Sequence, residues 1–118
     1  LAAAYLHDIG IHEAERKHRS TAGRYQELEG PPIARQIMED LGAAEQLVQE
    51  VCDIIGHHHH PRSEETINFK VLYDADLIAN LEEKQKKAEL NCDHLKQIIN
   101  SRFYTETGRK RADRLLTQ

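Results

Sequence analysis

The 118 residues are enough for one compact domain and too few for two. The formal net charge of -4 argues against a nucleic-acid-binding surface, which needs an excess of basic residues. No apolar run is long enough to span a membrane, no secretory leader is visible, and two cysteines are too few for a disulfide framework. These features favour a cytoplasmic protein with reduced thiols.

The chain opens with an apolar segment of small residues that predicts a buried helix as far as Leu6. His7 and Asp8 follow at its C-terminal tip, and Gly10 supplies the flexible backbone common just past a helix end. A buried carboxylate beside an imidazole must be paired or bound to a metal. Because the sequence starts with Leu1 inside this apparent core helix, we expect a further helix upstream.

The next segments predict a loop and two short helices. Residues 11–20 are rich in charge and predict a loop with at most one helical turn. A short helix is expected over residues 21–28, and the Gly-Pro-Pro sequence at residues 30–32 should break it. Proline fits the first turn of a helix, so the following helix should run from this point to about Leu41.

The second half of the chain predicts longer helices. One runs from about Ala44 to the four consecutive histidines at residues 57–60. Asn68 is expected to cap another over residues 69–90. Two shorter helices should follow, one capped by Asn91 and one over residues 105–116. No strand-type alternation is long enough to matter, so the sequence predicts an all-α bundle of roughly five to seven helices.

Two acids, Asp74 and Asp76, interrupt the apolar face of the helix expected over residues 69–90. Aspartate has poor helix propensity, and a buried one needs a partner. Asp76 and Asn80 are four residues apart and therefore share a face of the helix. A hydrogen bond to a neighbouring helix would explain Asp76 taken alone.

The four histidines at residues 57–60 are candidates for metal binding, because neutral imidazole is a common ligand of transition metals. A solvated helix end is the alternative, since imidazolium favours the C-terminal dipole. Consecutive helical residues point about 100° apart, so at most two of the four can face one site. Mixed His and Asp ligands suit Mn, Fe, Co, Ni or Zn better than Mg.

In order and spacing, these motifs resemble the HD-domain superfamily of metal-dependent phosphohydrolases. The matching segments are Leu-His-Asp-Ile-Gly at residues 6–10, Ile-Ile-Gly-His-His-His at residues 54–59, and Asp-Ala-Asp at residues 74–76 with Asn80. The resemblance covers most of residues 1–81. It implies a single HD-like domain over residues 1–118, with a helical extension over 82–118 and the family's first histidine on a helix upstream of residue 1.

The resemblance also implies one or two divalent transition-metal ions and a set of ligands. In the family, a His-Asp pair supplies two ligands and a later aspartate closes the site. Two-metal branches add a pair of histidines. Here that pair is His58 and His59, with His57 as the alternative. Those branches also carry a histidine near Gly30, where this chain offers a carboxylate. The implied ligands are His7, Asp8, His58, His59, Asp76 and Glu29.

Catalytic and substrate-binding roles follow from the same resemblance. Asp8 would orient a metal-activated water, and His58 would stabilise the charge that develops on the phosphoryl oxygens. Lys17 and His18 could bind an anionic phosphate, although a solvent-exposed cluster of charged residues explains them equally well. Asn80 is a further candidate contact with the substrate.

The function implied is hydrolysis of a phosphate ester of a nucleotide or small phosphorylated metabolite. The partner implied is that small substrate, with no nucleic acid and no membrane. Two alternatives stay open: a non-catalytic sensing or scaffold module, which the absent upstream histidine favours slightly, and a di-iron oxygenase of the same superfamily. The charged segment at residues 82–87 could extend into solvent or pack on a second copy in a homo-oligomer.

Overall fold

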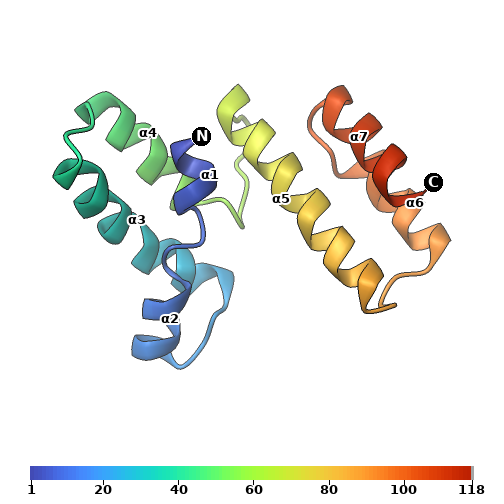
Figure 1. Ribbon diagram of the computed structural model, residues 1–118, viewed down its shortest axis with the longest axis horizontal. Helices are drawn as coiled ribbons and strands as arrows, with labels where there is room; N and C mark the ends of the chain where they lie inside the picture. The colour runs from blue at the N-terminus through green and yellow to red at the C-terminus, as the bar shows by residue number, and fades with distance from the viewer. Residues whose placement is uncertain (118) are drawn as a thin grey trace. The chain divides into compact units, whose positions relative to one another are not determined.

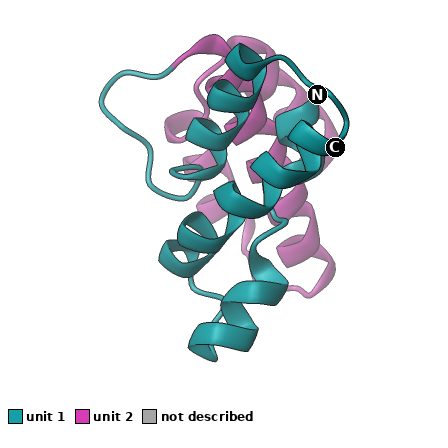
Figure 2. Ribbon diagram, turned by 90° about the vertical axis from the view of Figure 1, so that its left-hand side faces the viewer, with its two compact units in different colours: residues 1–65 teal, residues 66–118 magenta. Residues whose placement is uncertain are grey.

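The computed structural model describes residues 1–117, and every regular element among them is an α-helix. The helices are numbered α1 to α7 along the chain (Figure 1). The prediction of an all-α fold with five to seven helices is therefore confirmed. The chain divides into two compact units, Leu1–Glu65 and Thr66–Gln118, which are coloured separately in Figure 2. None of the described helices is long and apolar enough to cross a membrane.

Unit 1 contains four helices: α1 (Ala2–Leu6), α2 (Ile11–His18), α3 (Gly23–Asp40) and α4 (Glu45–Ile55). Its core lies between α3 and α4, which run beside each other in Figure 1. Apolar residues at helical spacing on these two helices supply the buried side chains, as the periodicity predicted for α4. The buried core residues are Ala34, Met38, Val48, Val51 and Ile55.

The expectation that the first helix is buried was wrong. None of the five residues of α1 is buried, and Tyr5 is 80% exposed. Ala2, Ala3 and Leu6 are partly buried against the core of unit 1. A helix of less than two turns presents only one narrow stripe to its neighbour, so the apolar composition of this segment overstated its burial.

The predicted loop at residues 11–20 is also wrong, because most of it forms α2. Glu13 pairs with Arg16 and Lys17 at helical spacings of three and four residues, and such pairs stabilise an exposed helix. Basic residues fill the last turn, where they complement the helix dipole. The helix ends at His18, and the C-cap residue Arg19 adopts the left-handed conformation with φ 54°.

The predicted break at residues 30–32 is wrong as well. α3 is one continuous helix, with Pro31 and Pro32 inside it. Each proline removes a backbone donor from the helix, which normally favours a break. Here packing compensates, since Gly30 lies directly against Ile55 and the thiol of Cys52 donates a hydrogen bond to the Pro31 carbonyl at 3.5 Å.

Unit 2 contains α5 (Ile67–Lys86), α6 (Cys92–Ser101) and α7 (Glu106–Leu116). The predicted cap at Asn91 is confirmed, since its side chain accepts a hydrogen bond from the His94 amide at 2.8 Å. The apolar faces of the three helices meet in one core. The buried residues of that core are Leu77, Leu81, Leu95, Ile98, Ile99, Ala112 and Leu116.

The bounds of α5 differ from the prediction at both ends. The side chain of Thr66, not of Asn68, accepts the capping hydrogen bond from the Phe69 amide. The helix ends at Lys86 instead of about Leu90, because Ala88 turns left-handed with φ 55°. The predicted boundary between core motifs and extension, at residues 81 and 82, falls inside this helix, whereas the two units divide after Glu65.

Candidate metal centre

Two chain turns bring the candidate ligands of unit 1 together. His7 is the C-cap of α1, and Asp8 follows in the turn that leads to α2. The histidines at residues 57–60 form the turn after α4, closed by a hydrogen bond from the His60 amide to the His57 carbonyl. Asp8, His58 and His59 each offer one ligand atom, and these atoms lie within 4.8 Å of one another.

His7 adjoins this group. Its Nε2 lies 3.2 Å from Oδ2 of Asp8, and its ring meets the ring of His58 edge to face at a centroid distance of 5.4 Å. Four of the six ligands implied by the sequence are thus neighbours within unit 1: His7, Asp8, His58 and His59. The structure therefore places a mixed nitrogen and oxygen donor set at the ends of α1 and α4.

Backbone carbonyls fix which nitrogen two of these histidines present. Nδ1 of His7 lies 2.9 Å from the carbonyl oxygen of Ala4, and Nδ1 of His58 lies 2.8 Å from that of Ile55. A carbonyl oxygen only accepts hydrogen bonds, so Nδ1 must be the donor in both rings. In the neutral imidazole, the lone pair then sits on Nε2, as in many metal-ligating histidines.

The Nε2 atom of His58 is buried and has no hydrogen-bond partner in the described part of the chain. The nearest carboxylate oxygen, Oδ1 of Asp8, lies 3.6 Å away, which is too far for a hydrogen bond. Nε2 of His7 faces the other oxygen of the same carboxylate. A positive charge, carried by a proton on an imidazole or by a metal ion, must balance the Asp8 carboxylate here, and this set of nitrogen and oxygen donors fits a divalent transition metal.

Asp8 supplies the negative charge of the centre. The imidazole of His58 first, and that of His7 second, lower the pKa of the Asp8 carboxyl well below its usual range, against the opposing effect of partial burial. The side chain is 49% exposed, so it borders both the buried histidines and solvent. Asp8 is therefore an ionised carboxylate that solvent can reach.

The other histidines of the turn are directed elsewhere. Nδ1 of His57 lies 2.5 Å from the Asp53 carbonyl oxygen, and its Nε2 lies 2.9 Å from Oε1 of Glu65. Nδ1 of His60 lies 2.5 Å from Oε1 of Glu27. Only the two middle histidines of the run join Asp8, which matches the expectation that two neighbours at most can share one site.

Glu29 lies with the two residues predicted to bind substrate. Its carboxylate accepts hydrogen bonds from Lys17 at 3.1 Å and from His18 at 2.8 Å, and the His18 ring stacks on Tyr25. The hydrogen bonds from His18 and then Lys17 lower the pKa of Glu29. Within the described residues, no group of potential metal ligands includes Glu29. Its role as a ligand remains a prediction.

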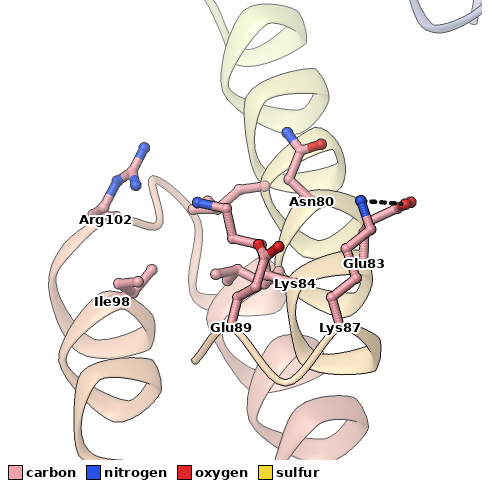
Figure 3. Close-up of a pocket in the computed structure, with 9 residues that line it drawn as sticks. Asn80, Glu83, Lys84, Lys87, Glu89, Ile98 and Arg102 are labelled. Carbon is pink, nitrogen blue, oxygen red and sulfur yellow. Dashed lines mark ion pairs between the residues drawn. The ribbon is translucent and has the colours of Figure 1, made fainter. Parts of the chain in front are cut away.

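The remaining predicted residues lie on α5 in unit 2. The side-chain amide of Asn80 donates to Asp76 at 3.4 Å, as expected for residues on one helix face. Asn80 also lines a cavity of about 420 Å³ beside Lys84 and Arg102, drawn in Figure 3. The role of Asp76 as the closing metal ligand remains a prediction, and so does the role of Asn80 as a substrate contact.

Sequence reasoning missed several residues that hold the centre. Gln26 and Glu27 contact the turn after α4, and Glu65 contacts His57. None of these residues belongs to a motif, and Gln26 and Glu27 lie more than 30 residues before the histidines that they contact. Their placement depends on how α3 and the loop before α5 fold against the end of α4, which no local pattern records.

Comparison with known proteins identifies the family. The model of the HD domain matches residues 1–81, which is more than half of the chain. Searches among curated proteins and among solved structures found no match. The chain therefore belongs to the HD-domain family, as the order of its motifs predicted. The HD domain is a fold that metal-dependent phosphohydrolases typically contain.

Proposed function

We propose that this protein is a metal-dependent phosphohydrolase that cleaves a phosphate ester of a nucleotide or a small phosphorylated metabolite. The main support is the buried Nε2 of His58, which faces an ionised Asp8 without a hydrogen-bond partner among the described residues. A native fold rarely leaves such a nitrogen unsatisfied unless a ligand completes it. We assign the first metal to Asp8, His58 and His59, whose ligand atoms lie within 4.8 Å of one another, and we assign His7 as a further ligand of the centre.

The donor set suggests the class of metal. Imidazole nitrogens with a carboxylate suit Mn, Fe, Co, Ni or Zn, whereas Mg favours oxygen ligands and water. A divalent ion, when bound, lowers the pKa of a coordinated water and polarises a phosphoryl oxygen. We assign Asp76 as a further ligand and leave open whether the complete site holds one ion or two.

Asp8 and His58 take different parts in the proposed reaction. The carboxylate of Asp8 is half exposed, so it can accept a hydrogen bond from the attacking water and hold it in line with the phosphorus. The ring of His58 is buried and fixed through Nδ1, so it would hold the lone pair of Nε2 toward the metal without reorganisation, and the bound ion would stabilise the charge on the phosphoryl oxygens. Water is excluded on the His58 side of the site.

Lys17 and His18 are proposed to contact the phosphate of the substrate, with Asn80 as an additional polar contact. Both side chains are held by Glu29, so an anionic substrate would compete with that carboxylate for them. Such competition favours a highly charged phosphate over a neutral ligand.

A non-catalytic HD module is the second candidate. The observation that favours it is the pairing of Glu29 with Lys17 and His18, which removes one carboxylate from the predicted two-metal set. A module of this kind would retain the fold and could bind a metal or small ligand without turning it over.

The test is metal analysis and hydrolysis with the full-length protein. We expect stoichiometric Mn, Fe, Co, Ni or Zn by elemental analysis, and metal-stimulated release of nitrophenol from p-nitrophenyl phosphate. Asp8→Ala should remove both. Asp53→Ala is the matched control and should leave both unchanged, because among the described residues its carboxylate pairs with Arg62 alone, at 2.9 Å.

The outcomes separate the two candidates. Metal binding without hydrolysis of any phosphate ester would favour the non-catalytic module. Protein that binds no metal and shows no metal-stimulated hydrolysis would disprove the proposed function.

A further inference from the structure

The first turns of α3 form a support for His59. Nε2 of His59 lies 2.9 Å from Oε1 of Gln26, and the backbone amide of His59 donates to Oε2 of Glu27 at 3.0 Å. Gly23 packs against the ring, since a Cβ at that position would lie 2.9 Å from Cβ of His59. Both the main chain and the imidazole of His59 are therefore held by one helix.

The orientation of the Gln26 amide follows from its second contact. Its Nε2 lies 2.5 Å from the carbonyl oxygen of Thr21, which can only accept a hydrogen bond. The amide nitrogen must therefore point to Thr21, and the amide oxygen must point to His59. Because that oxygen only accepts, Nε2 of His59 carries the proton, and Nδ1 carries the lone pair of the neutral ring.

His59 thus has the opposite tautomer to its neighbour. His58 donates from Nδ1 to the Ile55 carbonyl and keeps the lone pair on Nε2. The two rings lie 3.9 Å apart at an angle of 42°, and both residues offer a ligand atom near Asp8. Adjacent residues in a turn leave the chain in different directions, so different nitrogens allow both rings to serve one centre.

We infer that Gln26 is a positioning residue that makes Nδ1 the metal-binding nitrogen of His59. Gln26 does not contact the proposed metal itself. It fixes the proton of His59 on the nitrogen that faces α3, and the contact with Thr21 prevents the amide from turning over. The ligand role of His59 rests on the proposed function, whereas the tautomer is a property of the metal-free protein.

The first test reads the tautomer directly. The full-length protein, labelled with ¹⁵N in its histidines and freed of metal with a chelator, is studied by NMR at about pH 8, where ordinary imidazoles are neutral. We expect His59 to give the signature of protonated Nε2, and His58 that of protonated Nδ1. A His59 ring protonated on Nδ1 would overturn the inference, whether or not the protein binds metal.

The second test uses a matched set of variants. Gln26→Leu removes the acceptor and should leave His59 in a mixture of tautomers, with Mn²⁺ affinity lowered about 10-fold to 100-fold, the usual cost of losing such a support. Gln26→Glu keeps an acceptor and should retain the single tautomer and most of the affinity. Gln36→Leu, which loses a hydrogen bond to the exposed side chain of Asp40, should behave as wild type.

The results distinguish this inference from the proposed function. Wild-type affinity in Gln26→Leu, or a single unchanged tautomer in that variant, would overturn the positioning role. If the wild-type protein binds no metal, the proposed function fails, and the tautomers of wild type and Gln26→Glu still decide whether Gln26 orients His59. Circular dichroism of each variant confirms that it is folded.

Discussion

Each unit contains a buried polar centre, Asp74 in unit 2 and His58 in unit 1, and the two differ in how completely they are satisfied. In unit 2, Asp74 is 3% exposed and accepts hydrogen bonds from the Tyr104 amide, the Thr105 amide and the Thr105 hydroxyl, all at 2.6–2.8 Å. In unit 1, His58 is 6% exposed and has one ring nitrogen satisfied and the other not. A satisfied centre serves the fold, and an unsatisfied one indicates a ligand.

The centres are also held in place by different forces. Asp74 ties α5 to the start of α7 through hydrogen bonds, because Thr105 is also the N-cap of α7. The turn carrying Asp8 is held instead by close backbone packing, where Gly10 meets Gly30 and the Gln26 carbonyl. Removing a polar group should therefore damage unit 2, whereas adding a methyl group should damage unit 1.

Asp74→Ala should cause the largest loss of stability. It leaves the amides of Tyr104 and Thr105 without their acceptor and weakens the start of α7. Lost hydrogen bonds to a buried charged acceptor predict a decrease of about 3 kcal/mol in the free energy of unfolding. Urea denaturation followed by circular dichroism measures it. Glu82→Ala, on the exposed face of the same helix, should change stability by less than about 0.5 kcal/mol. Equal effects would show that Asp74 does not hold unit 2 together.

Gly10→Ala should cause the next largest loss. A Cβ at Gly10 would lie 2.6 Å from the Gln26 carbonyl oxygen and 2.7 Å from the Gly30 nitrogen, both backbone atoms that cannot move aside easily. Overpacking of this kind predicts a decrease of about 2 kcal/mol in the free energy of unfolding, and it should also displace Asp8 and weaken metal binding.

Gly42→Ala provides the comparison for that substitution. Gly42 has a left-handed φ of 77° and no atom near the added Cβ, so only backbone strain of about 1 kcal/mol is expected, with metal binding intact. The same urea denaturation and Mn²⁺ titration apply to both. If Gly10→Ala bound Mn²⁺ as tightly as Gly42→Ala, close packing at Gly10 would not position Asp8.

The sequence predicted the elements whose signals are local. Periodic apolar residues located α4, and the capping residue Asn91 located the start of α6. It failed where tertiary contacts override local preference. α3 continues through Pro31 and Pro32 because Gly30 and Cys52 connect it closely to α4, and a single sequence does not show that contact.

The same limit applies to the site. The positions of His7, Asp8 and the histidine turn were predicted from motifs, and the structure brings them together. Which histidine nitrogen faces the centre depends on carbonyl oxygens and on the Gln26 amide, which are hydrogen-bond partners set by the fold. The buried role of Asp74 was passed over in favour of Asp76, because both acids lie on the same apolar helix and the donors of Tyr104 and Thr105 come from a distant loop.

His58→Leu is the smallest and sharpest test of the comparison. The unsatisfied Nε2 costs stability in the metal-free protein, and its removal offsets the loss of the hydrogen bond from Nδ1 to the Ile55 carbonyl. The free energy of unfolding should therefore change by less than about 1 kcal/mol, while metal binding is lost. His57→Leu is the matched control, since both nitrogens of His57 are hydrogen-bonded and Glu65, whose side chain is 4% exposed, would lose its imidazole partner and keep the Arg62 amide. That control should lose about 2 kcal/mol in urea denaturation with a chelator present. If His58→Leu lost as much as His57→Leu, the two histidines would have the same structural role, and the unsatisfied nitrogen would not distinguish the centre of unit 1 from that of unit 2.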